Sequence, residues 1–96
     1  MIRSFGDEKT KDVFDGSNTK AARKVPKEIH GVAQRKLDYL NAAGKLGDLR
    51  VPPGNRLEPL EGDFEGFHSI RINDQWRVCF VWRDGHAEDV EIVDYH

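Results

Sequence analysis

The spacing of apolar residues predicts one long helix in the first half of the chain. Apolar positions recur at intervals of three and four residues, the period of one helix face, at Ile29, Val32, Ala33, Leu37 and Leu40. Pro26 suits the first turn of such a helix and Gly44 its end, so we predict a helix over residues 27–43. A shorter helix is predicted between Asp7, a suitable N-cap, and Gly16.

The second half of the chain changes to the two-residue period of β-strands. The stretch QWRVCFVW predicts a strand with one apolar face formed by Trp76, Val78, Phe80 and Trp82. We expect this face to pack against the helices and Arg77 to project from the opposite face. Asn73-Asp74 and Asp84-Gly85 are pairs suited to tight turns, and they predict hairpins on both sides of this strand.

The remaining segments complete a predicted single domain over residues 1–96. Residues 1–5 predict a short first strand and residues 87–96 a last strand. The stretch 47–66 is rich in proline and glycine, so it predicts a loop with at most a short strand over 56–60. This element order favours an α+β fold, in which two helices pack on one face of a twisted, mainly antiparallel sheet.

Composition limits the classes of protein to which this chain can belong. No apolar run is long enough to span a bilayer, and the first residues are too polar for a secretory signal, so we expect a soluble cytoplasmic protein. The single Cys79 lies in an apolar stretch, excludes an internal disulfide and is expected to be buried. The four histidines lack the spacing of metal ligands, and we therefore expect neither a metal ion nor a cofactor.

Charge is distributed unevenly along the chain, although the net charge is only −2. Residues 1–50 hold eleven Lys and Arg against seven Asp and Glu, whereas residues 51–96 hold four against ten. Around the acid Glu28 the sequence places six cations: Lys20, Arg23, Lys24, Lys27, Arg35 and Lys36. A positive stripe can bind phosphate groups even on a mildly acidic protein, and a solvated helix face is an equally good interpretation.

Two features of the predicted sheet carry candidate chemistry. Arg77 is a cation on an otherwise apolar strand, and such a side chain needs either a ligand or an ion-pair partner such as Asp94 or Glu58. The last strand ends in Asp94, Tyr95 and His96, an acid, a phenol and an imidazole in succession. We interpret this end as a candidate site into which a docked final strand delivers the imidazole.

Three stretches of the sequence together resemble one known family. RLEPLEGD, HSIRINDQWRVCF and the final VDYH are similar to segments of the HigB-type toxins, GraT-like members included, in the RelE/ParE toxin superfamily. The resemblance spans nearly the whole chain and implies a small RelE-like fold. It also implies the toxin of a bacterial type II toxin–antitoxin pair, which cleaves mRNA in the ribosomal A site and has a HigA-like helix-turn-helix antitoxin as partner.

The resemblance also implies which residues form the site. The positions that match the family's site are Arg77, Asp94, Tyr95 and His96, and the resemblance places Glu58 across the cleft from the chain end as a further catalytic candidate. Arg56 takes the place of a basic residue of the family, and we expect RNA contacts around the site at Arg56, Arg71 and His68. On its apolar strand, His68 is as readily interpreted as a half-buried histidine. Glu58 stands where many relatives have a histidine, and Glu61 where they have a lysine.

The chemistry expected of these residues is metal-independent attack of a ribose 2′-OH on the adjacent phosphate. This reaction needs a base, an acid and a cation for the phosphorane. We assign the base to Glu58 and the acid to His96, and we expect the planar fork of Arg77 to clamp the phosphate. Tyr95 would stack on an RNA base or orient the phosphate, and the basic stripe would grip ribosomal RNA.

A binding protein without catalysis is the competing interpretation. The same fold could bind the ribosome, or an antitoxin alone, and block translation by occupancy. Carboxylates at Glu58 and Glu61 favour this interpretation more than a histidine and a lysine would. Whether the message is cut or stays intact on stalled ribosomes distinguishes the two functions.

Overall fold

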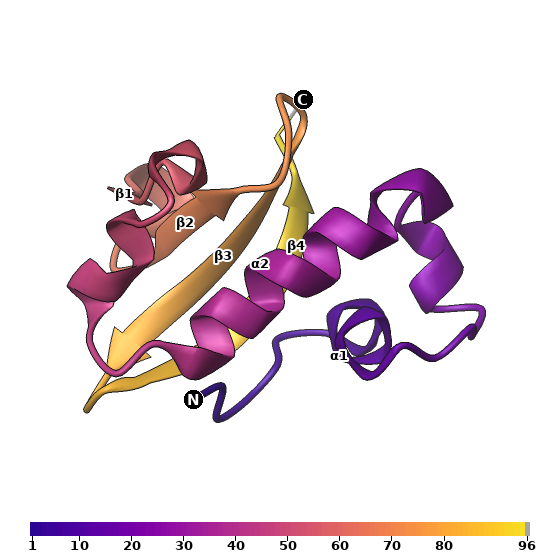
Figure 1. Cartoon of the computed structure of the whole chain (residues 1–96), viewed down its shortest axis with the longest axis horizontal. Helices are drawn as coiled ribbons and strands as arrows, with labels where there is room; N and C mark the ends of the chain where they lie inside the picture. The colour runs from indigo at the N-terminus through magenta and orange to yellow at the C-terminus, as the bar shows by residue number, and fades with distance from the viewer. Residues whose placement is uncertain (96) are drawn as a thin grey trace.

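Two helices lie on one face of a four-stranded antiparallel sheet in the computed structural model, which describes residues 1–95 (Figure 1). The helices are α1 (Glu8–Asp15) and α2 (His30–Ala42). The strands are β1 (Glu58–Pro59), β2 (His68–Arg71), β3 (Trp76–Arg83) and β4 (His86–Asp94). Each strand pairs with the next one along the chain, and the predicted α+β arrangement is confirmed. Among these described residues, no helix has the length and apolar character to cross a membrane.

The long helix α2 begins later than its apolar pattern predicted. Lys27–Ile29 forms a separate 3-10 turn, closed by a hydrogen bond from the Ile29 N–H to the Pro26 carbonyl (3.1 Å). Proline fixes the backbone at this entry, and the regular α-helix starts only at His30. The core face of α2 follows the predicted period, because its buried residues are Ala33, Lys36, Leu37 and Leu40.

The short helix α1 has the two caps that the sequence predicted. The Asp7 carboxylate accepts a hydrogen bond from the Thr10 N–H (3.0 Å). Gly16 adopts the left-handed conformation, with φ of 74°, and its N–H bonds to carbonyls of the last turn. Burial would raise the pKa of Asp7, but hydrogen bonds from Lys9 and Thr10 lower it below the ordinary value. The charged carboxylate is therefore favoured at this helix N-terminus.

The central strand β3 gives the sheet one apolar and one polar face. Val78 pairs with Ile70 on β2 and with Ile92 on β4, and all three are buried in the core on the helix side. Phe80 is the largest fully buried side chain, and the two tryptophans of β3 pack partly buried against the same core. The predicted apolar face is confirmed, so Arg77 projects from the other face.

The first residues of the chain do not form the predicted strand. They run beside β4 and make only two isolated parallel bridges, Ile2 with Ala87 and Phe5 with Val90. A bulge in β4 explains the interruption, because the spacing of its partners shows one extra residue near Asp89, whose φ is 53°. The prediction of a strand over residues 1–5 was therefore wrong, although the segment does lie along the sheet edge.

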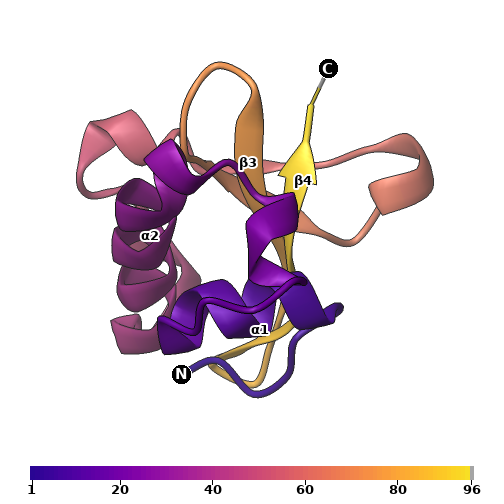
Figure 2. The same cartoon turned by 90° about the vertical axis from the view of Figure 1, so that its right-hand side faces the viewer.

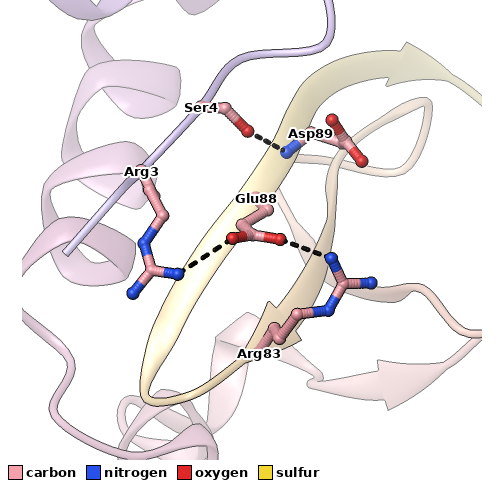
Figure 3. A network of polar contacts seen from close by, with 5 residues as sticks. All are labelled: Arg3, Ser4, Arg83, Glu88 and Asp89. Atoms are coloured by element: carbon pink, nitrogen blue, oxygen red, sulfur yellow. Dashed lines mark hydrogen bonds and ion pairs between the residues drawn. The ribbon is translucent and has the colours of Figure 1, made fainter.

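Polar contacts hold this N-terminal segment where the bulge interrupts the ladder (Figure 3). The N–H of Asp89 donates to the hydroxyl of Ser4 (2.9 Å). The carboxylate of Glu88 accepts from Arg3 (3.2 Å) on the segment and from Arg83 (2.8 Å) at the end of β3. One acid therefore joins the N-terminal segment to the β3–β4 hairpin.

The loop between α2 and β2 leads around the edge of the sheet. The predicted strand over 56–60 shortens to the two residues of β1, and one further backbone hydrogen bond follows it, from the Leu60 N–H to the Phe67 carbonyl (2.9 Å). Figure 2 shows the next segment, which contains the 3-10 turn Gly62–Phe64, on the far side of the sheet from α2. The loop therefore flanks the polar face on which Arg77 lies.

Candidate active site

The strand register gathers polar residues on the face of the sheet that is turned away from the helices. Residues that pair directly in antiparallel strands project to the same side. Glu58 on β1 and Cys79 on β3 both pair with Ser69 on β2. Arg71 on β2 pairs with Arg77 on β3. The structure thus brings together the predicted base, the predicted clamp and one predicted RNA contact.

Arg77 is 9% exposed, and three groups of the protein hold its guanidinium. Its Nε donates to the hydroxyl of Ser69 (2.7 Å), and its Nη2 donates to the carbonyl of Arg56 (2.8 Å). The same Nη2 lies 3.5 Å from Oε1 of Glu58, so of the two acids proposed as its ion-pair partner the structure shows Glu58. Within residues 1–95, Nη1 donates to no acceptor. The end of the planar fork is therefore available to a ligand.

Arg71 and Arg56 add positive charge beside Arg77. Nη2 of Arg71 donates to the carboxylate of Asp74 in the β2–β3 turn. This hydrogen bond, together with the charges of Arg71 and Arg56, holds the pKa of Asp74 below its ordinary value. Arg56 has a left-handed backbone, with φ of 45°, in a conformation that sends its carbonyl to Arg77.

The two cations on this face have carboxylate partners that are more exposed than the cations themselves. Like charges that lie directly opposite in a sheet destabilise it, and Arg71 and Arg77 are such a pair. The side chain of Glu58 is 51% exposed against 11% for Arg77, and that of Asp74 is 99% exposed against 32% for Arg71. Exposed carboxylates are well solvated and bind their partners weakly. An incoming phosphate can therefore displace them.

Tyr95 follows β4 and places its ring beside Arg77. Its N–H donates to the carbonyl of Gln75 (2.6 Å), which docks the backbone one residue beyond the strand. Cζ of Arg77 lies 5.7 Å from the ring centroid, a cation–π contact. Burial raises the pKa of Tyr95 and nearby Cys79 adds to the shift, whereas Arg77 opposes it. The phenol therefore keeps its proton at neutral pH and can donate a hydrogen bond.

Asp94, another residue of the predicted terminal run, does not lie beside Arg77. Asp94 pairs with Trp76 in the β3–β4 ladder, which puts it on the opposite side of the sheet from Arg77. Its carboxylate accepts a hydrogen bond from the side chain of Gln75 (3.2 Å). His96 lies outside the described residues, and its role as the acid stays a prediction.

His68 is not brought to the Arg77 face. It pairs with Phe80 in the β2–β3 ladder, and the two rings stack with centroids 6.2 Å apart. Its Nδ1 is buried and has no hydrogen-bond partner in the part of the chain that the structure describes. This placement favours the interpretation of His68 as a half-buried histidine of the strand.

The predicted basic stripe divides into exposed cations and one buried lysine. The exposed members are Lys20, Arg23, Lys24, Lys27 and Arg35. Lys36 is only 9% exposed, and its Nζ donates to Oδ1 of the buried Asn55 (2.6 Å). Burial lowers the pKa of Lys36, and the positive charges of Arg35 and Arg71 act in the same direction. Lys36 is therefore an internal support of the loop, unlike the other five cations.

Two residues that support the site, Ser69 and Asn55, are not among those predicted from the sequence. Both side chains are fully buried, and Ser69 is the partner of Arg77 Nε. The amide of Asn55 donates to the carbonyl of Leu49 (3.1 Å) and so braces the loop that carries Arg56. Strand alternation could have placed Ser69 beside Arg77 once the strands were paired, whereas no local pattern marks Asn55.

Cys79 lies within the site but has no nucleophilic role. It is fully buried, as predicted. Burial raises the pKa of its thiol to about 11; Arg77 opposes the shift and Glu91 adds to it. The reactive form of cysteine is the thiolate, so a protonated thiol at neutral pH is inert.

Neither of two surface pockets, each of about 290 Å³, includes Arg77. One is bordered by Arg23 and Lys27, and the other by Arg50 and His68. Across residues 1–95, no three His, Cys, Asp or Glu side chains are grouped so that they could hold a metal ion. The predicted lack of a metal ion stays a prediction. The Arg77 site itself lies on the polar face of the sheet.

Comparison with known proteins decides the family. A family model described as RelE-like toxin of type II toxin-antitoxin system HigB matches residues 3–96. The chain belongs to this HigB family. Toxin HigB-1 of Vibrio cholerae serotype O1 is 42% identical over 87 residues, which cover 91% of this chain and 90% of the relative. Endoribonuclease HigB of Proteus vulgaris is 31% identical over 96 residues, the whole of both chains.

Solved structures confirm the RelE-like fold of this HigB-family chain. The YoeB-YefM complex from Staphylococcus aureus matches with a TM-score of 0.61 and 14% identity, over 100% of this chain and 98% of that one. A YafQ mutant from E. coli matches with a TM-score of 0.58 and 20% identity, over 98% and 93%. At family level the expected enzyme class is confirmed as well, since a relative that matches over its full length is named an endoribonuclease.

Proposed function

We propose that this HigB-family toxin is an endoribonuclease that cleaves mRNA in the ribosomal A site. The observation that carries the proposal is the buried guanidinium of Arg77. Neutral oxygens accept hydrogen bonds from its Nε and Nη2, and the half-exposed carboxylate of Glu58 lies 3.5 Å from the same Nη2. A cation fixed in this way binds the scissile phosphate when RNA displaces the carboxylate. The relative named Endoribonuclease HigB supports RNA as the substrate.

The proposed reaction uses the ribose 2′-OH as its nucleophile and no metal ion. Glu58 takes the hydroxyl proton, and the 2′-oxygen attacks the adjacent phosphorus to form a cyclic 2′,3′-phosphate as the bond to the 5′-oxygen breaks. His96, assigned from the family resemblance, gives a proton to the leaving 5′-oxygen. Arg77 stabilises the negative charge of the phosphorane.

The residues around Arg77 would orient the RNA strand. Tyr95 is 44% exposed, so its ring offers a stacking surface and its protonated phenol can donate to a phosphate oxygen. Arg56 and Arg71 would hold neighbouring phosphates, with RNA competing against Asp74 for Arg71. His68 is left out of these contacts because its ring packs on the core.

The ribosome would hold the message in place for this reaction. The segment from β1 onwards exposes four carboxylates that repel free RNA, those of Glu58, Glu61, Asp63 and Glu65. A flexible strand is then poorly held for in-line attack unless another body positions it. The exposed cations between Lys20 and Arg35 would contact ribosomal RNA, which would make ribosome binding weaken steeply as salt rises. Action on ribosomes implies a cytoplasmic location.

A type II toxin has a cognate antitoxin, and membership of the family gives this chain such a partner. We propose a HigA-like helix-turn-helix protein in that role. A ribosome-bound or antitoxin-bound protein that blocks translation without cutting RNA is the second candidate. The exposed carboxylates favour it, because they weaken the hold on RNA in the site.

The test is cleavage of ribosome-bound message by the purified protein, read by primer extension. We expect codon-phased cuts with the parental chain and about 100-fold slower cutting by Glu58→Gln, because a positioned base contributes on the order of 10²–10⁴-fold. His96→Gln should lose activity by a similar factor. Stalled ribosomes on intact message would establish the blocker instead. Undiminished cutting by Glu58→Gln would place the base elsewhere.

A further inference from the structure

Ser69 lies at the centre of the polar face, between the predicted base and the central strand. It pairs with Glu58 on one side and with Cys79 on the other, and it is fully buried. Its hydroxyl accepts the hydrogen bond from Nε of Arg77 at 2.7 Å. A hydrogen bond with a charged donor is stronger than one between neutral groups. The buried serine is therefore bound firmly to the guanidinium.

The bonds of Arg77 define which part of its fork faces outward. Ser69 occupies Nε at the inner end of the planar group, and the carbonyl of Arg56 occupies one N–H of Nη2. Two bonds at separate atoms of a rigid plane fix both its position and its tilt. The donors that face outward are Nη1 and the second N–H of Nη2. Nη2 lies 3.5 Å from Oε1 of Glu58. These donors match the oxygens of one phosphate group.

We propose that Ser69 is a positioning residue, which orients the guanidinium of Arg77 so that the end of its fork faces the scissile phosphate. The inference rests on the proposed function for the role of Arg77. Without the serine hydroxyl, Nε loses its acceptor, and the long arginine side chain is free to turn Nε toward the RNA or Glu58. Arg77 would keep its charge but lose its alignment with the phosphorane. The rate of the chemical step would therefore fall more than the affinity for the substrate.

The experiment compares Ser69→Ala with the parental chain in ribosome-dependent cleavage. Alanine is smaller than serine and fits the same strand position without a clash. We expect kcat to fall about 10–100-fold, the loss expected from a slightly misplaced catalytic group, with KM for the ribosome–message complex unchanged. NMR of the Arg77 Nε–H supplies a second readout that needs no RNA. Its signal should be protected from solvent exchange in the parental protein and lose that protection in Ser69→Ala.

Thr10→Val is the matched control. The hydroxyl of Thr10 is also fully buried, and it accepts a hydrogen bond from the N–H of Ile92 (2.8 Å) on the helix side of the sheet. Both variants should lower the Tm by about 4–8 °C, the shift expected for one lost buried hydrogen bond in a chain of this size. Only Ser69→Ala should lower kcat and expose the Arg77 Nε–H.

The outcomes separate this inference from the proposed function. Parental kcat in folded Ser69→Ala would overturn the positioning role and leave the nuclease intact. An equal fall of kcat in Thr10→Val would overturn it too, since the loss would then follow stability alone. If the parental chain cuts no message, the proposed function fails, and the NMR comparison tests the orientation of Arg77 by itself: loss of protection in Ser69→Ala supports the claim that Ser69 orients the guanidinium, and an unchanged signal overturns it.

Discussion

Two arginine–carboxylate clusters lie near opposite ends of β3. In one the arginine is the more buried partner, and in the other the carboxylate is. At the start of the strand the cation is covered, since the side chain of Arg77 is 11% exposed and that of Glu58 is 51% exposed. At its end the acid is covered, since Glu88 is 15% exposed whereas Arg3 and Arg83 are 46% and 62% exposed (Figure 3). The same residue types thus form inverted arrangements.

The difference shows that the buried partner decides what an ion pair can do. The carboxylate of Glu88 has its two oxygens occupied by two arginines of the same chain, so the cluster joins segments and needs no ligand. The guanidinium of Arg77 keeps donors on its outward end and faces an acid that water already solvates. A covered cation with a weakly held counter-ion is suited to bind an anion, and the RNA phosphate is the anion that we propose.

The largest effect should come from Arg77→Lys, which keeps the charge and removes the planar fork. Because only the fork can hold two phosphate oxygens, we expect cleavage of ribosome-bound message to slow by about 10²–10³-fold. Single-turnover cleavage measures this rate. Glu88→Gln, at the opposite cluster, is the control and should leave the rate unchanged. A lysine variant that cuts at the parental rate would show that charge alone is sufficient.

An intermediate effect should come from Asn55→Ala, because Asn55 braces the loop that carries the Arg56 carbonyl. The variant leaves the buried ammonium of Lys36 without its acceptor, so unfolding should become easier by about 1–3 kcal/mol. Urea denaturation measures this loss. Asn41→Ala is the matched control, since Asn41 accepts from the exposed N–H of Ile2 (2.9 Å) and should cost no more than about 0.5 kcal/mol. Equal losses in the two variants would contradict the bracing role.

The smallest effect should come from Glu88→Gln on stability. Its partners are exposed, so the loss should be about 1 kcal/mol and should shrink as added salt screens the charges. Asp74→Asn removes a carboxylate that is 99% exposed and should cost less than this. If the two variants cost the same, burial of the acid is not what distinguishes the clusters.

Local patterns predicted the elements well and the contacts between them less well. The caps of α1, the core face of α2 and the apolar face of β3 depend on neighbours in the chain, and all were confirmed. The strand predicted over residues 1–5 failed, because a bulge in a distant strand limits its pairing. Lys36 was grouped with its basic neighbours, although its position on α2 points it into the core.

The sequence by itself determined the order of the elements, the family and the side of β3 from which Arg77 projects. These features follow from periodicity and motifs, which lie within short stretches of chain. Only the tertiary structure decided which groups contact the guanidinium of Arg77. Ser69 is eight residues away in sequence and the carbonyl of Arg56 twenty-one residues away. Strand register and the path of a braced loop bring them together, and neither is encoded by a local pattern.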